Sequence, residues 1–116
     1  MITGKYPELR LRRSRKNDWS RRLIEENNLS PNDFILPIFL IDGKNKKQEI
    51  KSMPGVYRYS LDKLIYVVDN AIKKGLPTVA LFPYTEKKKK NLLGAEALNE
   101  NNLVCRALQI IKNRFK

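Results

Sequence analysis

The sequence predicts an α/β fold in which parallel strands alternate with helices. Two short apolar runs, residues 34–41 and residues 78–82, have the length of strands, and an amphipathic segment with a helical period lies between them. A strand, a helix and a second strand in this order form a βαβ unit with parallel strands and a right-handed crossover. The length of 116 residues and the apolar fraction of 41% suit a single domain with one core.

The first apolar run predicts a strand that is buried on both faces. Seven of its eight residues are large and apolar, and the polar pair Asp42-Gly43 ends it at a turn. Pro37 lacks an amide hydrogen, so we expect it near the start of the strand, at an edge or at a bulge. The second run predicts another short buried strand, which Pro83 closes.

The segment between these strands predicts the clearest helix of the chain. Ser60 is a good N-cap, Gly75 fits the left-handed position after the helix, and Pro77 prevents its continuation. A last helix is expected from about residue 102 to residue 115, with Cys105 beside its apolar stripe as a small packed side chain rather than a redox or metal-binding group. The apolar positions are Leu61, Leu64, Ile65, Val68, Ala71 and Ile72 in the first helix and Leu103, Val104, Ala107, Leu108 and Ile111 in the last.

Residues 1–17 predict an extended basic arm. This segment has no sustained apolar period and is rich in arginine, so it is expected to be disordered when it is alone in water. Asn17 or Asp18 then caps a short helix that ends near residue 27. The arm is therefore expected to precede the folded part of the chain, residues 18–116.

The connecting segments are polar and leave the predicted sheet small. Residues 44–51 predict an exposed loop, and residues 86–102 predict a second loop with one turn of helix near residues 95–97. A parallel sheet normally contains several strands and has both faces covered, whereas this pattern offers two strands. The order of elements therefore predicts the first two β/α units of a (β/α)₈ barrel, a fold that typically needs about 250 residues.

The composition excludes several kinds of chemistry. The chain has no histidine and one cysteine, so the usual zinc sets, a histidine base and an intrachain disulfide are all excluded. It has no run of eighteen apolar residues and no signal-peptide pattern at its start. We therefore expect a soluble, cytoplasmic protein that does not enter a membrane.

The net charge of +12 raises the question of nucleic-acid binding. Much of the positive charge lies in the run Lys87 to Lys90 and in the first 22 residues, at Lys5, Arg10, Arg12, Arg13, Arg15, Lys16, Arg21 and Arg22. No helix-turn-helix, RNA-recognition signature or zinc finger accompanies it. Basic runs without interleaved aromatic residues favour a solvated face or an arm that docks on an acidic protein surface, so nucleic acid is the less favoured partner.

Several segments, in order and over nearly the whole chain, resemble the N-terminal part of porphobilinogen synthase, also called delta-aminolevulinic acid dehydratase. The segment Asp18-Trp19-Ser20-Arg21-Arg22-Leu23 is most similar to bacterial members of this family. The other matching segments are Arg10-Leu11-Arg12-Arg13, residues 29–39 (LSPNDFILPIF), residues 52–58 (SMPGVYR), residues 75–83 (GLPTVALFP) and residues 94–99 (GAEALN).

The resemblance implies a (β/α)₈ barrel behind an N-terminal arm that embraces a neighbouring subunit in an octamer. It implies condensation of two molecules of 5-aminolevulinate to porphobilinogen, a step of tetrapyrrole (heme) biosynthesis. In the family this reaction uses Schiff-base lysines of lowered pKa, and the full-length enzymes use Mg or Zn. The resemblance places those lysines and the metal ligands beyond the residues of this chain.

Accordingly, no residue of this chain is assigned a catalytic, cofactor-binding or metal-binding role, and the 116-residue segment alone is expected to be inactive. Lys87 to Lys90 are expected to be solvated in a polar loop without the apolar pocket that a Schiff-base lysine needs. Barrel sites form at the C-terminal ends of strands, so Phe82 and Tyr84 are candidates for a pocket wall; the alternative is that both simply pack under loops.

Two other hypotheses remain open at this point. The chain is alternatively a non-enzymatic assembly or binding module that acts through its basic arm on a protein partner. Binding to nucleic acid is the third hypothesis, and it predicts retention on DNA or RNA that falls steeply with salt.

Overall fold

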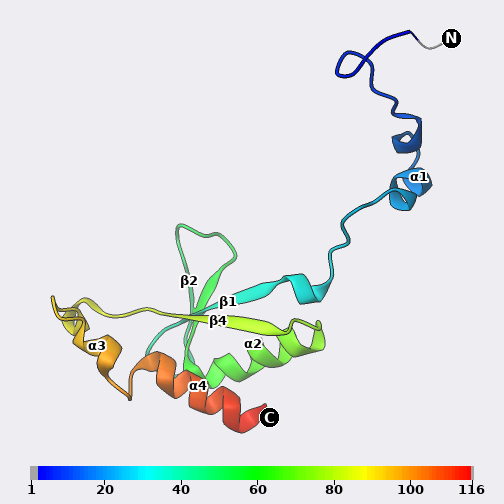
Figure 1. The fold of residues 1–116 in the computed structure, drawn as a ribbon. Helices are drawn as coiled ribbons and strands as arrows, with labels where there is room; N and C mark the ends of the chain where they lie inside the picture. Colours follow the sequence, from blue (N-terminus) through cyan, green and yellow to red (C-terminus); the bar gives the residue numbers. More distant parts are fainter. Residues whose placement is uncertain (1–2, 116) are drawn as a thin grey trace.

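A computed structural model describes residues 3–115 and contains eleven elements. The strands are β1 (Ile35–Leu40), β2 (Lys47–Glu49), β3 (Tyr57–Tyr59) and β4 (Thr78–Pro83). The helices are α1 (Asp18–Leu23), α2 (Leu61–Lys73), α3 (Ala95–Leu98) and α4 (Leu103–Arg114), with short 3-10 turns η1 (Arg13–Arg15), η2 (Pro31–Asp33) and η3 (Lys87–Lys89). Figure 1 shows a sheet-and-helix body from which the N-terminal segment projects.

The four strands form one sheet in the order β2-β3-β1-β4. Strands β1 and β4 pair in parallel along their whole length, from Ile35 opposite Thr78 to Leu40 opposite Pro83. The predicted parallel pair with α2 as its crossover is therefore confirmed. On the other side of β1, the shorter β3 also pairs in parallel, and β2 pairs with β3 in antiparallel orientation.

The prediction of two strands and a loop over residues 44–51 is wrong. Lys47–Glu49 form β2 and face β3 across a turn that is closed by backbone hydrogen bonds, among them Ile50 N to Val56 O at 2.9 Å. The side chains of β2 are all exposed, so its sequence carries no apolar signal, and pairing of its backbone with β3 defines it. This hairpin covers the edge of the sheet next to β3.

The core lies on one face of the sheet, against helices α2 and α4, which run side by side there (Figure 1). Ile38 and Leu40 alternate along β1 and point into this core. The buried cluster consists of Ile38, Leu40, Leu64, Val68, Leu103 and Ala107. The expected burial of both strands on both faces is wrong for the described residues, because Ile35 and Phe82 remain 63% and 49% exposed.

The two long helices begin and end close to their predicted limits. Ser60 stands at the N-cap of α2, but its fully buried hydroxyl accepts the Lys46 amide at 2.9 Å and gives the helix no capping bond. Asn102 does cap α4, because its side-chain oxygen accepts the amide of Cys105 at 2.9 Å. Gly75 follows α2 with a φ of +75°, which is the left-handed conformation expected there.

Two positions of the predicted apolar stripes are exposed. Ile72 on α2 is 51% exposed, and Leu108 on α4 is 44% exposed. Both lie on the margins of their stripes, whereas Leu64 and Ala107 at the stripe centres are completely buried. Cys105 is half-buried beside the α4 stripe, as the sequence predicts.

Pro37 lies in the middle of β1, at a local edge of the sheet. Its partner on the β4 side is Ala80, while pairing with β3 begins only at Phe39. The missing amide hydrogen of proline therefore costs no ladder bond on the β3 side. Of the three positions that the sequence allows for this proline, the edge position is the observed one.

The N-terminal segment extends away from the sheet and helices, and the described chain measures 73 × 35 × 25 Å along its principal axes (Figure 1). Residues 3–17 are all exposed. Helix α1 ends at Leu23, earlier than the predicted residue 27, and its Trp19 and Leu23 side chains are 62% and 77% exposed. These two apolar side chains of α1 therefore remain largely in solvent.

Within residues 3–115, no helix has both the length and the apolar character that crossing a membrane requires.

Candidate functional site

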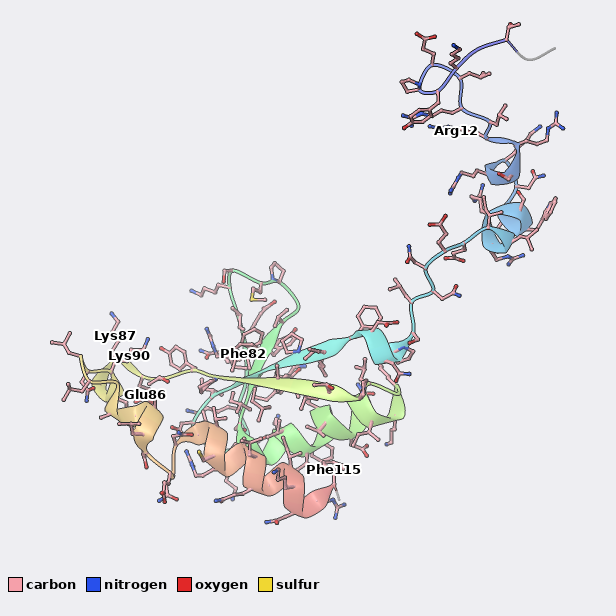
Figure 2. All side chains as sticks on the ribbon, viewed as in Figure 1. Arg12, Phe82, Glu86, Lys87, Lys90 and Phe115 are labelled. Carbon is pink, nitrogen blue, oxygen red and sulfur yellow. The ribbon has the colours of Figure 1, made fainter. Side chains whose placement is uncertain are left out.

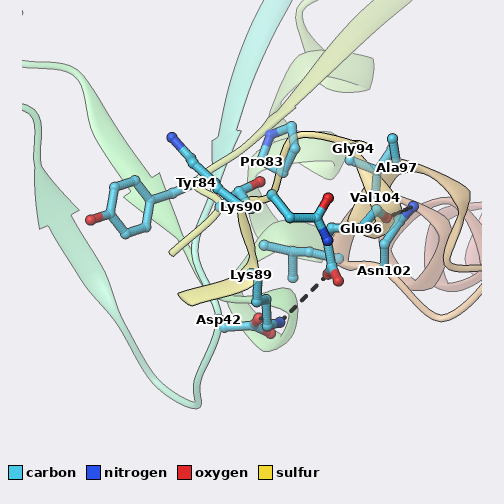
Figure 3. A pocket seen from close by; sticks show the side chains of 13 residues that line it. Asp42, Pro83, Tyr84, Lys89, Lys90, Gly94, Glu96, Ala97, Asn102 and Val104 are labelled. Atoms are coloured by element: carbon cyan, nitrogen blue, oxygen red, sulfur yellow. Dashed lines mark hydrogen bonds and ion pairs between the residues drawn. The ribbon is translucent and has the colours of Figure 1, made fainter. Parts of the chain in front are cut away.

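A cleft of about 540 Å³ opens at the C-terminal ends of β1 and β4. The ends of neighbouring parallel strands meet at this edge, and the η3–α3 segment and the start of α4 complete the walls (Figure 3). The lining residues are Asp42, Pro83, Tyr84, Thr85, Lys89, Lys90, Asn91, Gly94, Glu96, Ala97, Asn102, Leu103 and Val104.

Four charged side chains form a connected network at the base of the cleft. Asp42, two residues beyond β1, binds Lys89 through Oδ2 at 3.0 Å and Arg106 through Oδ1 at 2.6 Å. The Nζ atom of Lys89 also lies 3.6 Å from Oε1 of Glu96 in α3. We call this set, Asp42, Lys89, Glu96 and Arg106, the four-charge network; it holds two negative and two positive groups and is neutral overall.

The network fixes the charge states of its central pair. Hydrogen bonds from Lys89 and Arg106, together with their positive charges, lower the pKa of Asp42 below its ordinary value of 3.8. The hydrogen bond to Asp42 and the carboxylate charge raise the pKa of Lys89 above its ordinary value of 10.5. Asp42 is therefore a carboxylate and Lys89 an ammonium ion at neutral pH.

These charge states limit what the cleft does chemically. A Schiff-base lysine needs a neutral amine at working pH, which a lowered pKa supplies, and the pKa of Lys89 moves in the opposite direction. A general base works best with a pKa near neutrality, and that of Asp42 is lowered. The arrangement suits electrostatic positioning of chain segments rather than nucleophilic or acid–base chemistry.

Arg106 also places its Nε atom at this site. Its Nε is buried and has no hydrogen-bond partner among the described residues, while its terminal nitrogen binds Asp42. The guanidinium of Arg106 thus contacts the Asp42 carboxylate through one terminal nitrogen. Its side chain is 40% exposed overall, so the group is held by the ion pair rather than enclosed by the core.

Tyr84 and Phe82, the two candidates for a pocket wall, have different surroundings. Tyr84 lines the cleft, and the guanidinium of Arg58 lies 4.8 Å from the centre of its ring. Phe82 is not among the lining residues; its ring packs against Phe39 of β1 with centroids 5.6 Å apart. Phe82 lies within β4, whereas Tyr84 follows the end of that strand at Pro83, and of the two only Tyr84 lines the cleft.

The lysine run does not behave as one solvated group. Lys87, Lys88 and Lys90 are exposed, as the sequence predicts, and Figure 2 shows Lys87 and Lys90 at the end of the body farthest from α2. Lys89 is an exception: it is half-buried and carries two ion pairs. The expectation of four solvated ammonium groups is wrong for Lys89.

Sequence reasoning missed Lys89, Glu96, Asn102 and Arg106 as members of this site. One usable signal existed, because Asp42 follows one strand and the lysine run follows its parallel neighbour, so both are carried to the same edge of the sheet. Which of the four lysines faces Asp42 depends on the turn η3 and carries no sequence signal.

The described residues do not provide a metal centre. Among residues 3–115, no three histidine, cysteine or acidic side chains gather as metal ligands. The two acids of the cleft, Asp42 and Glu96, are already engaged by Lys89.

Parallel strands joined by helices, with a cleft at the carboxyl edge of the sheet, define an α/β protein of the class that places its ligands at that edge. The sequence profile of the delta-aminolevulinic acid dehydratase family matches residues 8–116. The chain therefore belongs to the delta-aminolevulinic acid dehydratase family.

Individual relatives agree with this assignment. The chain is 49% identical to the delta-aminolevulinic acid dehydratase of Bradyrhizobium diazoefficiens over 92% of its length, and 42% identical to that of Chlamydia pneumoniae over 91%. These matches cover 30% and 32% of the two relatives, so the chain spans about a third of their length.

A solved structure has the same fold over this segment. The delta-aminolevulinic acid dehydratase (porphobilinogen synthase) of Toxoplasma gondii ME49, in complex with its reaction product porphobilinogen, superposes with a TM-score of 0.84 at 34% identity. The similarity covers 92% of this chain and 30% of that one. The mixed α/β sheet described above thus resembles the corresponding part of that structure.

Proposed function

We propose that this chain is the N-terminal part of a porphobilinogen synthase, which condenses two molecules of 5-aminolevulinate to porphobilinogen in heme biosynthesis. The observation that carries the proposal is the family match over residues 8–116 together with the parallel β1–β4 pair. In this proposal residues 1–17 are the basic arm and residues 18–116 begin a (β/α)₈ barrel. The exposed apolar side chains on the uncovered face of the sheet, such as Phe82, would then face the barrel interior.

The proposed contribution of this segment is a wall of the substrate site. The cleft lies at the carboxyl edge of the sheet, where barrel enzymes bind their substrates, and its lining combines Tyr84 and Pro83 with the four-charge network. Lys89, which lines this cleft, has a raised pKa and is held as an ammonium ion. The Schiff-base chemistry of the family is therefore assigned to other parts of a complete enzyme, and this segment alone is proposed to be inactive.

The same reasoning applies to the metal. The family implies Mg or Zn for the full-length enzyme, and residues 3–115 provide no set of ligands that fits either ion. We propose that this segment binds no metal.

The N-terminal arm is proposed to dock on a neighbouring subunit in a homo-octamer. Residues 3–17 are exposed and project from the body, so they have no partner surface within the described chain (Figure 2, where Arg12 marks the arm). A basic segment of this kind gains order and affinity from an acidic protein surface. We propose a cytoplasmic location, in keeping with a soluble biosynthetic enzyme.

A chimera tests the proposed function. The matching segment of the Bradyrhizobium diazoefficiens relative is replaced by this chain, and porphobilinogen formation from 5-aminolevulinate is measured. We expect product to form, because 49% identity preserves the fold and the strand-end geometry. The unmodified relative is the positive control, and the purified 116-residue chain is expected to form no product.

Two results would contradict the proposal. A chimera that folds and assembles like the relative but forms no porphobilinogen would show that this segment does not serve that enzyme. Turnover by the 116-residue chain alone would show that its own residues carry the chemistry.

The projecting arm supports one alternative, a non-enzymatic module that binds an intact synthase. It predicts that the chain co-purifies with a full-length relative and that deletion of residues 1–17 abolishes this association. If the chain is instead retained on DNA or RNA with a steep salt dependence, nucleic acid becomes the partner.

A further inference from the structure

We propose that Asp42 is a positioning residue, which ties the loop after β4 to the ends of the strands and so fixes the wall of the cleft. This inference rests on the proposed function for its catalytic consequence, but its structural part concerns this chain alone. The loop in question, residues 84–102, contains η3 and α3 and supplies most of the cleft lining.

Apolar burial does not hold this loop in place. Leu92, Leu93 and Leu98 are 107%, 88% and 82% exposed, and no side chain between residues 86 and 100 of the described chain is buried. Tyr84 N donates to Leu40 O at 2.8 Å and so holds the first residue of the loop, but the backbone hydrogen bonds between residues 86 and 102 are local, such as Lys89 N to Glu86 O at 3.0 Å and Ala97 N to Gly94 O at 2.9 Å. A loop with so few anchors would open easily, because local opening costs little where no core contact is lost.

The ion pair between Asp42 and Lys89 supplies the missing anchor. It joins residues 47 positions apart, and the second bond of Asp42, to Arg106, spans 64 positions. One carboxylate therefore connects the end of β1, the turn η3 and the helix α4, and Lys89 extends the connection to Glu96 of α3. Figure 3 shows Lys89 between Asp42 and Glu96 at the cleft.

The exposure of the pair is compatible with this task. The side chains of Asp42 and Lys89 are 30% and 35% exposed, so each is partly shielded from water without a large desolvation cost. Each carboxylate oxygen takes a different cation, which fixes its orientation better than a single contact. Removing the charge of Asp42 would release Lys89 and Arg106 together.

Limited digestion with trypsin tests directly whether the ion pair between Asp42 and Lys89 holds the loop, because the cleavage sites, Lys87 to Lys90, lie on the loop itself. The variant Asp42→Asn keeps the shape of the side chain and leaves every trypsin site unchanged. We expect cleavage within the lysine run to rise about two- to fivefold, the change that loss of a partly shielded ion pair gives a local opening equilibrium. Cleavage elsewhere in the body is expected to be unchanged.

A matched control lies in the same loop. The variant Glu86→Gln removes the local ion pair between Glu86 and Lys88, at 2.8 Å, and leaves the tie to β1 intact. Its cleavage rate is expected to equal that of the parent chain. If Asp42→Asn and Glu86→Gln are cleaved at the same rate, the inference is overturned.

The catalytic consequence is tested in the chimera described above. Asp42→Asn is expected to raise KM for 5-aminolevulinate about fivefold with little change in kcat, because a loosened wall weakens binding and leaves the reacting groups in place. A fivefold loss of kcat with unchanged KM would overturn the positioning role. If the chimera with Asp42 unchanged has no activity, the proposed function is rejected. The trypsin experiment would still test whether the ion pair between Asp42 and Lys89 holds the loop.

Discussion

The β/α body, residues 35–114, and the N-terminal segment, residues 3–30, are held by different forces. In the body, Leu40, Leu64 and Ala107 are completely removed from water between the sheet and the helices α2 and α4. In the N-terminal segment, α1 is six residues long and its Trp19 and Leu23 remain mostly exposed. Apolar burial therefore defines the body, whereas the N-terminal segment depends for its order on a surface that it contacts.

The loop of residues 84–102 is intermediate between these two regions. It belongs to the body by position, yet its leucines are exposed and its long-range attachment is the four-charge network. Partly exposed ion pairs contribute little compared with a buried leucine, so this loop should be the first part of the body to open.

The largest expected effect comes from removing a core side chain. Leu64→Ala empties a completely buried position on α2 and should lower the free energy of unfolding by about 3 kcal/mol. Ile72→Ala on the same helix is the matched control, and at 51% exposure it should cost less than about 1 kcal/mol. Urea unfolding followed by circular dichroism measures both, because Trp19 lies in the projecting segment and does not report on the core. Equal losses for the two variants would mean that α2 is not packed as described.

A smaller effect is expected at the end of α2. Gly75→Ala forces an L side chain into a φ of +75°, which costs about 1–2 kcal/mol. The added Cβ would lie 3.6 Å from Pro31, an ordinary contact, so strain in the backbone is the cause. Gly75→Asn should lose less stability, since asparagine tolerates the left-handed conformation. The same urea titration decides, and identical losses would contradict a backbone origin.

The four-charge network predicts a pH-dependent effect of about 1 kcal/mol or less. Because the pKa of Asp42 is lowered in the folded chain, its contribution is present above its ordinary pKa of 3.8 and is lost as pH falls through the lowered value. The stability difference between the parent chain and Asp42→Asn should therefore be constant near neutrality and shrink in acid. At the alkaline end, the raised pKa of Lys89 keeps that partner charged beyond pH 10.5, and the part of the difference that comes from Lys89 is lost as pH rises through the raised value, while Arg106 stays charged. A difference that is the same at pH 3 and pH 7 would show that the charge of Asp42 is not involved.

The smallest effect on stability is expected in the arm. Deletion of residues 1–17 should leave the urea midpoint of the chain unchanged, because residues 3–17 are exposed and pack against no part of the body. In the chimera, the same deletion should lower the assembly state seen by sedimentation velocity. An unchanged assembly state would show that the arm does not join subunits.

The kinds and positions of most elements, and the family of the chain, could be predicted from the amino-acid sequence. Apolar runs predicted β1 and β4, helical periodicity predicted α2 and α4, and Gly75 and Asn102 marked helix ends. These signals are local, because propensity, capping and periodicity act over a few residues. Motifs such as residues 52–58 and 75–83 carried the family resemblance.

Which faces are buried and which charged side chains pair depends on the folded arrangement of the chain. The hairpin strand β2 has exposed side chains and is defined by its pairing with β3, so its sequence resembles a loop. Asp42 selects Lys89 from four adjacent lysines, although 47 positions separate the two residues. Such contacts form because the sheet and the turn η3 bring together backbone segments that are far apart in the sequence. A sequence pattern over a few residues does not show which distant segments become neighbours in space.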